Sequence, residues 1–344
     1  MRILVDAMGG DNAPEAIVSG SMDAINESEG FEIVLIGDAQ KIEKLFKKRK
    51  FKNPRVMVIN AGEVITNEDI PTKAIKHKKD SSMVVGFNML KEKKGDVFIS
   101  AGNTGALMTG ALLILGRIQG VDRPALAPIL PSRNGHVMLI DAGMNTVCKP
   151  INFVQFGIMG SIYMKEVFHM KTPRVGLINI GSEEVKGTDV IKQAYALAAN
   201  SNINFVGNIE GREIMEGRVD VAVCDGFVGN VLLKFVEGVG PFIFDSLKEV
   251  YSKSLLSRLA GLLVKSGLRE FRKKLDYKEQ GGARILGVDG KVIKSHGSSD
   301  AKAIKNAIFR AAGYGKSYIV EQMRDEFKLW KTKLLTLNQC NSNI

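Results

Sequence analysis

The segment Val97-Phe98-Ile99-Ser100-Ala101-Gly102-Asn103-Thr104-Gly105-Ala106 decides the fold of this chain. Its first three residues predict a buried strand, its two glycines predict a sharp turn, and the apolar run 106–115 predicts a helix. Thr104 is placed to cap that helix, whose first free N–H groups would point into the turn. Such a turn suits an anion, especially a phosphate. A glycine turn that serves only packing would look the same, so the interpretation depends on whether the arrangement recurs.

Five predicted strand-to-helix turns combine glycine with small polar residues. They lie at residues 6–12, 100–106, 181–188, 225–230 and 296–300. Strands that alternate with helices pair in parallel, and ligands bind at the carboxyl ends of such strands. Hairpin turns after two other predicted strands add antiparallel pairs. The sequence therefore predicts a three-layer α/β fold with a mixed, mostly parallel sheet, in which the five turns converge on one phosphate-binding cleft.

Composition limits the class of protein without choosing its partner. The 344 residues are 45% hydrophobic and 25% charged, with a net charge of +11, which favours nucleic acid, an acidic protein, anionic lipid or phosphorylated substrates. We expect one domain over residues 1–335, with two lobes around one cleft as an open alternative, and a frayed tail over 336–344. Three cysteines without a C-x-x-C pair predict a reduced, cytoplasmic protein. We expect no signal peptide, no membrane-spanning run and no metal site.

Residues 252–275 depart from the alternating pattern. Leucines recur there at helical spacing, and seven basic residues stand against one acidic residue. Gly261 and Ser266-Gly267 predict that the segment divides into a protruding amphipathic helical hairpin. Two interpretations stay open: helices packed on the core or on a second subunit, or a basic element that contacts an anionic membrane or an acidic partner. The residues expected at such a contact with a membrane or an acidic partner are Leu255, Arg258, Leu259, Leu262, Leu263 and Lys265.

The predicted cleft supplies three candidate catalytic residues, Lys186, Asn230 and His296. A lysine in a glycine-flanked turn can bind phosphate or stabilise a developing oxyanion, and a histidine can donate a proton. A surface lysine and a histidine that only holds its turn would fit the same pattern. The motifs of serine hydrolases and of nucleotide-binding P-loops are missing. The residues expected to bind phosphate or the rest of the substrate are Gly102, Asn103, Thr104, Gly105, Gly181, Asp225, Gly226, Gly229 and Ser298.

Several motifs in one order resemble the bacterial phosphate acyltransferase family (PlsX type). They are MRILVDAMGGDNAP, SAGNTGALMTG, GRIQGVDRPALAPILP, TPRVGLINIGSEEVKGT, INFVGNIEGRE, DGFVGN and VIKSHGSSD, and the resemblance extends from residue 1 to about residue 325. It implies a homodimer with an isocitrate/isopropylmalate dehydrogenase-like fold. It also implies that a fatty acyl group passes from acyl carrier protein to inorganic phosphate, without a cofactor, and gives acyl phosphate for phospholipid synthesis.

The resemblance also implies where the enzyme works and how. It suggests a cytoplasmic, peripherally membrane-associated protein whose product passes to a membrane glycerol-3-phosphate acyltransferase. We expect phosphate to attack the thioester directly, held by Asn103, Thr104 and Ser298. Lys186 and Asn230 would stabilise charge, and His296 would protonate the departing thiolate.

Three positions depart from the usual pattern of that family. Val147 and Ile151 stand where acidic residues are usual, and Thr188 stands where asparagine is usual. Two other functions remain open: an NAD-dependent dehydrogenase of the same fold, and a non-enzymatic basic module for membrane or nucleic acid. The missing dinucleotide fingerprint argues against the first. The array of glycine turns argues against the second, and we expect no nucleic-acid partner.

Overall fold

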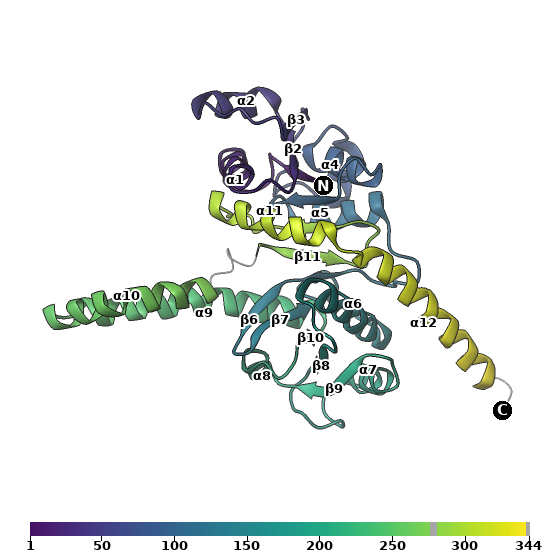
Figure 1. The fold of residues 1–344 in the computed structure, drawn as a ribbon. Coiled ribbons are helices and arrows are strands. Elements are labelled where there is room, and N and C mark those ends of the chain that lie inside the picture. Colours follow the sequence, from purple (N-terminus) through teal and green to yellow (C-terminus); the bar gives the residue numbers. More distant parts are fainter. Residues whose placement is uncertain (276–280, 342–344) are drawn as a thin grey trace.

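The strands form two sheets. The computed structural model describes the backbone of residues 1–275 and 281–341 and the side chains of residues 1–271 and 281–330. The first sheet has the order β3-β2-β1-β4-β12-β11-β5 and the second has the order β6-β7-β10-β8-β9. Neighbouring strands are parallel except β11, which is antiparallel to both neighbours, and β6, which is antiparallel to β7. The predicted mixed, mostly parallel α/β fold is confirmed, but its strands are shared between two sheets (Figure 1).

The bounds of the strands follow the apolar runs of the sequence. The strands of the first sheet are β3 (Val56–Asn60), β2 (Glu32–Gly37), β1 (Arg2–Asp6), β4 (Val97–Ser100), β12 (Val292–Lys294), β11 (Ala283–Leu286) and β5 (Ala125–Ala127). Those of the second are β6 (Ile129–Ser132), β7 (Gly135–Ile140), β10 (Val221–Val223), β8 (Arg174–Ile178) and β9 (Asn204–Ile209).

Pro128 marks the place where the chain passes from one sheet to the other. The sequence favours a single strand over 125–130, but the structure ends β5 at Ala127 and begins β6 at Ile129. Proline has no N–H to donate to a ladder, so pairing stops there. β5 pairs with β11 in the first sheet, and β6 pairs with β7 through the predicted Asn134-Gly135 hairpin.

Helices cover both sheets and share their core. They are α1 (Glu15–Asn26), α2 (Ala39–Lys48), α3 (Pro71–His77), α4 (Ser82–Lys91), α5 (Thr104–Gly110) with the π-helical turn η1 (Ala111–Leu115), α6 (Pro150–Phe168), α7 (Asp189–Ala199), α8 (Gly211–Glu216), α9 (Gly226–Ser252), α10 (Leu255–Leu275), α11 (Ala301–Lys316) and α12 (Ile319–Asn341). α6 is buried at every residue from 152 to 164. Its Phe156 belongs to one apolar cluster with Ile3 of the first sheet and Val221 of the second. The two sheets therefore share a continuous core.

The helical hairpin exists, but its turn lies elsewhere than predicted. α10 runs without a break through Gly261 and Ser266-Gly267, and the hairpin joins α9 to α10. Ser254 begins α10, because its hydroxyl accepts a hydrogen bond from the N–H of Ser257 at 3.1 Å. Gly261 is a packing position, where a Cβ atom would lie 3.2 Å from Tyr251. One glycine costs a helix only about 1 kcal/mol, so packing against α9 outweighs it.

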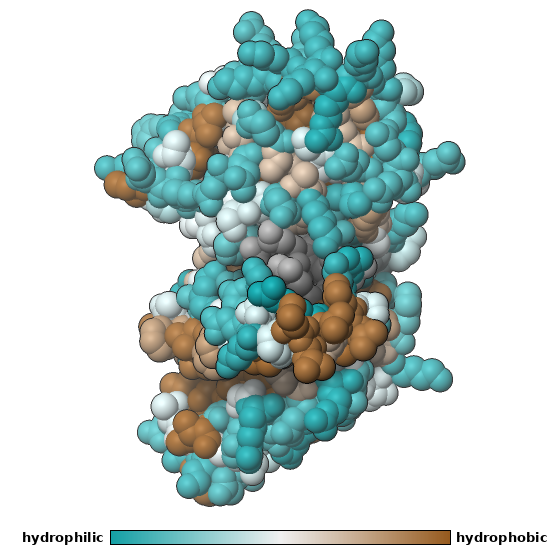
Figure 2. All heavy atoms as spheres, turned by 90° about the vertical axis from the view of Figure 1, so that its left-hand side faces the viewer, coloured by the Kyte–Doolittle hydropathy of each residue, from teal (hydrophilic) through white to brown (hydrophobic). Residues whose placement is uncertain are grey.

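The hairpin projects from the molecule as an arm with an apolar surface. Figure 1 shows α9 and α10 extending away from the sheets, and Figure 2, viewed from that side, shows apolar side chains gathered on the arm. α9 is the one helix among the described residues that is long and apolar enough to cross a membrane, although only 11% of that stretch is buried. The expectation that no such stretch exists is therefore wrong by length and composition. The exposed leucines of α10 are Leu255, Leu256, Leu259, Leu262 and Leu263.

The last helix, α12, extends into the segment that was predicted to fray. It continues to Asn341, and the fraying over 336–344 stays a prediction. Residues 331–341 contain neither glycine nor proline, and nothing in them stops a helix. Residues 342–344 lie outside the described part of the chain. The prediction of one domain over 1–335, with two lobes as the alternative, stays a prediction.

Candidate functional site

A cavity of about 230 Å³ lies between the carboxyl ends of first-sheet strands and the first turns of α9. Its polar wall comes from both sides, and its remaining wall is apolar. The polar side chains are Thr104, Asn230, Lys234, Glu237, Lys294, Ser295, His296 and Ser299. The apolar ones include Leu126, Ile129, Leu130, Leu233 and Val236. Three of the predicted site residues, Thr104, Asn230 and His296, therefore meet at one cavity.

Three of the five predicted turns come together beside this cavity, because β1, β4 and β12 are neighbours in the first sheet. The N–H of Asp11 donates to the carbonyl of Gly297 at 2.8 Å. The amide of Asn12 donates to the carbonyl of Ser298 at 3.2 Å. A Cβ atom on Gly9 would lie 2.7 Å from the nitrogen of Gly102, so only glycine allows this approach.

Asp6 links these turns through hydrogen bonds. Its buried carboxylate accepts hydrogen bonds from the hydroxyls of Ser82 and Ser100, each at 2.6 Å. Burial raises the pKa of Asp6, while the two serine hydrogen bonds act in the opposite direction. Among the described residues, no group of three or more His, Cys, Asp or Glu side chains could hold a metal ion. Asp6 is therefore a residue that fixes the turn.

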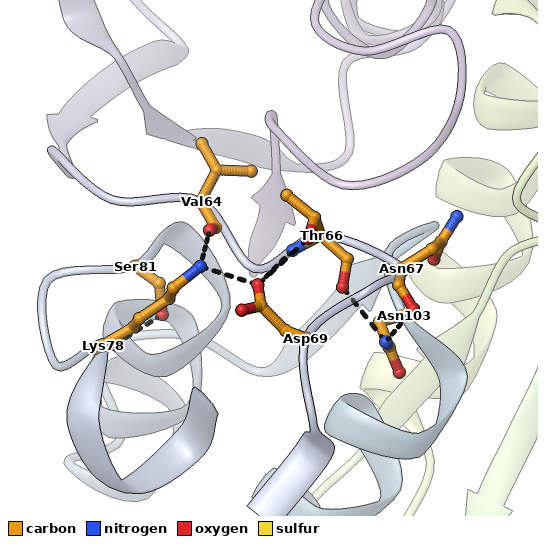
Figure 3. A network of polar contacts seen from close by, with 7 residues as sticks. All are labelled: Val64, Thr66, Asn67, Asp69, Lys78, Ser81 and Asn103. Atoms are coloured by element: carbon orange, nitrogen blue, oxygen red, sulfur yellow. Dashed lines mark hydrogen bonds and ion pairs between the residues drawn. The ribbon is translucent and has the colours of Figure 1, made fainter. Parts of the chain in front are cut away.

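Asn103 is engaged at both ends of its side chain. Its oxygen caps α5 by accepting from the N–H of Ala106 at 3.0 Å, so the predicted cap at Thr104 is wrong. Its nitrogen donates to the carbonyls of Thr66 and Asn67 at 3.1 and 3.4 Å (Figure 3). The same loop is held by an ion pair of 2.6 Å between Lys78 and Asp69. Asn103 positions the loop and the helix, and Thr104 is free of the capping role and lines the cavity.

Asn230 reaches the cavity because α9 packs closely against the loop that follows β7 of the second sheet. Asp225 caps this helix by accepting from the N–H of Val228 at 2.9 Å. A Cβ atom on Gly229 would lie 1.9 Å from the carbonyl oxygen of Asp141, and one on Gly226 would lie 2.8 Å from the nitrogen of Asn145. These two glycines let the helix approach the loop after β7. Asp225, Gly226 and Gly229 lie outside the cavity wall and position Asn230.

His296 is held by its neighbour Ser298. The N–H of Ser298 donates to Nδ1 of His296 at 3.2 Å, and the Ser298 hydroxyl lies 2.8 Å from the same nitrogen. Because Nδ1 accepts, the ring proton of the neutral histidine is assigned to Nε2. Burial lowers the pKa of His296. Ser298 therefore orients the histidine. Ser298 and Ser299 are the caps that the sequence favours for α11, but the structure uses Asp300, which accepts a hydrogen bond from the N–H of Ala303.

Lys186 and its loop lie apart from the cavity wall. Lys186 is exposed in the segment after β8, where the amide of Asn179 donates to its carbonyl at 3.1 Å. Gly102, Gly105 and Gly181 do not line the cavity either. Thr188 caps α7 by accepting from the N–H of Ile191 at 3.4 Å. The other two departures from the family pattern, Val147 and Ile151, are also outside the wall.

The sequence analysis missed the charged residues of the cavity. Lys234 and Glu237 stand three residues apart on α9 and form an ion pair of 2.7 Å. Lys294 ends β12 and is 9% exposed. Its burial lowers its pKa to about 8. The sequence signal for Lys294 is its position, because it ends an apolar strand shortly before a glycine turn.

Comparison with known proteins gives a consistent answer over nearly the full chain. Residues 1–322 match the family model described as "Fatty acid synthesis protein". A phosphate acyltransferase from Acetivibrio thermocellus is 58% identical over 327 residues, covering 95% of this chain and 96% of that protein. One from Alkaliphilus oremlandii is 51% identical over 325 residues, covering 94% and 97%.

Solved structures share the fold. A phosphotransacetylase from Staphylococcus aureus has a TM-score of 0.60 at 13% identity, covering 92% of this chain and 94% of that chain. A putative 4-hydroxythreonine-4-phosphate dehydrogenase from Salmonella typhimurium has a TM-score of 0.54 at 11% identity, covering 91% and 98%. At these identities the likeness concerns the fold alone. The identity to its sequence relatives over nearly the whole chain shows that this chain belongs to the phosphate acyltransferase family and is an enzyme.

Proposed function

We propose that this protein transfers a fatty acyl group from acyl carrier protein to inorganic phosphate, and that the transfer takes place in the cavity beside α9. The observation that carries the proposal is the composition of the cavity wall. Thr104, Asn230 and Lys294 offer hydroxyl, amide and ammonium donors for an anion. Leu126, Leu233 and their apolar neighbours offer a surface on which an acyl chain can pack. Family membership supports the same reaction.

The chemistry balances without a cofactor. An oxygen of hydrogen phosphate attacks the thioester carbonyl carbon and forms a C–O bond. The C–S bond then breaks, and the proton that the phosphate carried passes to the departing sulfur. The protein has to position the reactants and stabilise the tetrahedral oxyanion. Thr104 would hold phosphate, Asn230 would stabilise the oxyanion, and His296 would assist at the sulfur with its Nε2 proton.

Lys186 would act from outside the cavity wall. It is exposed on the loop after β8, and β8 pairs with β10, the strand that leads into α9 and Asn230. From this loop its ammonium would stabilise charge on the reacting groups. Gly181 of the same loop, together with Gly102 and Gly105 of the first sheet, would offer backbone groups along the path of the substrates.

The arm formed by α9 and α10 is the proposed contact surface for acyl carrier protein, the membrane and a second copy of the chain. Acyl carrier proteins are acidic, and α10 carries Arg258 and Lys265 among its exposed leucines. We propose that this basic, apolar helix touches an anionic membrane, where a glycerol-3-phosphate acyltransferase would receive the acyl phosphate. The enzyme would then be cytoplasmic and peripherally membrane-associated. The homodimer implied by the family resemblance would form through the exposed apolar face of α9.

Incubation of the purified enzyme with acyl–acyl carrier protein and phosphate tests the reaction. Acyl phosphate, trapped as the hydroxamate, should appear together with free carrier thiol in equal amounts, and only when phosphate is present. Thiol release without acyl phosphate would identify a thioesterase and contradict the proposal. A nicotinamide difference titration examines the dehydrogenase alternative, which shares the fold of one structural neighbour. A saturable shift there would favour the dehydrogenase.

A further inference from the structure

Lys294 is a buried cation without a carboxylate partner. Among the described residues, none of the ion pairs includes it. Its ammonium donates to the carbonyls of Ala101, at 3.5 Å, and of Ser295. Both carbonyls belong to turns that follow neighbouring strands, since Lys294 pairs with Ser100 of β4. The charge is therefore placed where two of the predicted anion turns meet.

The other charges of the cavity leave this one unbalanced. Lys234 lies on the facing helix and is paired with Glu237 at 2.7 Å, so those two charges offset one another. His296 is neutral above its lowered pKa. Asp6 and Asp11 are near enough to favour the charged form of Lys294, but neither forms an ion pair with it. A buried ammonium without a counter-charge is costly, and an anionic ligand would offset that cost.

We propose that Lys294 is the phosphate-anchoring residue of this enzyme, a role that rests on the function proposed above. Inorganic phosphate would lie between its ammonium and the hydroxyl of Thr104 on the same side of the cavity. A charge-assisted hydrogen bond of this kind is strong and directional. Lys294 thus places a buried charge next to the bound phosphate, whereas the exposed Lys186 would act on the reacting groups from its loop.

The lysine at the other end of β12 gives a matched control. Lys291 is half-buried and donates to the carbonyls of Gly315 and Ser317, at 2.7 and 2.6 Å, where α11 ends. It lies at the opposite end of the strand from the cavity. Lys291→Met removes a partly buried ammonium, as Lys294→Met does, but it leaves the cavity unchanged.

Steady-state kinetics of the full-length enzyme separates the two roles. Lys294→Met should raise the KM for phosphate by about 10- to 100-fold, with little change in the KM for acyl–acyl carrier protein. Lys291→Met should leave both constants near those of the wild type. Inorganic phosphate should raise the melting temperature of the wild type and of Lys291→Met, but not that of Lys294→Met. An unchanged KM for phosphate and an unchanged thermal shift in Lys294→Met would overturn the proposal.

Two further measurements test the proposal. The first is the pH profile of the wild-type enzyme. Its KM for phosphate should rise as the pH passes about 8, where Lys294 without bound phosphate loses its proton. A flat profile up to pH 9.5 would contradict the proposal. The second separates it from the proposed reaction. If the wild type makes no acyl phosphate, the reaction fails, but a phosphate-dependent thermal shift that requires Lys294 would still support the binding site.

Discussion

At the scale of single residues, hydrogen bonds decide what each side chain of the cavity can do. Both the oxygen and the nitrogen of the Asn103 side chain form hydrogen bonds within the protein. A phosphate bound at this turn would therefore contact Thr104 and backbone groups. His296 accepts at Nδ1 and keeps its proton on Nε2. Since its pKa is lowered, His296 is a neutral hydrogen-bond donor at neutral pH. The expectation of a phosphate-binding Asn103 thus stays a prediction that the geometry does not favour.

Cys148 and Cys224 should be inert in the folded enzyme. Burial raises the pKa of Cys148 to about 12, and it raises the pKa of the fully buried Cys224 well above its usual value. At pH 8 the thiolate fraction of Cys148 is then about one in 10⁴, against about a quarter for an ordinary cysteine. Iodoacetamide should leave both unmodified in native protein and label them in urea, as followed by peptide mass spectrometry. Rapid labelling of native Cys148 together with loss of activity would contradict this.

Lys186→Ala tests the contribution of the exposed loop. If Lys186 stabilises charge in the transition state, kcat should fall by at least about 10-fold with a smaller change in the KM for phosphate. The control is Lys192→Ala, on the exposed side of α7 a few residues further on, where activity should stay unchanged. Full acyl phosphate synthesis by Lys186→Ala would remove this residue from the mechanism and leave the cavity residues in place.

Among the elements, α9 has two faces of different character. Asn230, Leu233 and Glu237 face the cavity at helical spacing. Phe227, Val231, Phe235 and Phe242 recur on an exposed face and are between 55% and 71% exposed. Exposed aromatic side chains in a row mark an interaction surface. The first turns of the helix thus line the cavity, and the rest of its length presents an exposed apolar face.

The arm should bind anionic membranes through α10. Leu259 and Leu263 are 61% and 84% exposed, one helical turn apart. Leu259→Glu combined with Leu263→Glu should abolish flotation with phosphatidylglycerol vesicles, because charge is added and apolar area is lost. The control is Ser252→Glu combined with Ser266→Glu, which adds the same charge to the arm without removing a leucine. Equal flotation of both double variants and the wild type would contradict membrane binding by α10.

At the scale of the whole molecule, two sheets share one core and enclose one cavity. Pro128 sends the chain from the first sheet to the second, and α6 packs between them. The cavity can therefore join donors from β4 and β12 to a helix that begins after β10. Neither sheet alone has the complete wall.

The exposed face of α9 should hold two copies together. Phe235→Glu places a charge in the middle of the apolar row and should convert a dimer to a monomer in sedimentation velocity. Leu329→Glu, at an exposed position of α12, is the matched control and should stay dimeric. A wild type that sediments as a monomer at micromolar concentration would contradict the homodimer itself.

Most of the strands and helices, and part of the cavity wall, could be predicted from the sequence alone. Apolar runs located the strands, glycine turns located the loops, and motifs such as SAGNTGALMTG and VIKSHGSSD indicated the family. These signals are local, because a strand, a turn or a cap depends on residues a few positions apart. Thr104, Asn230 and His296 could be predicted because each stands in such a turn.

The contacts between distant parts of the chain determine which turns lie together and which side chains are left to bind a ligand. One sequence pattern describes all five turns, but strand order places those after β1, β4 and β12 together and leaves Lys186 on another loop. The neighbours of Lys294 in the chain place a lysine before a glycine turn, but they do not show that it is buried or that it has no carboxylate partner. Charge balance in a cavity is a property of groups brought together from distant parts of the chain.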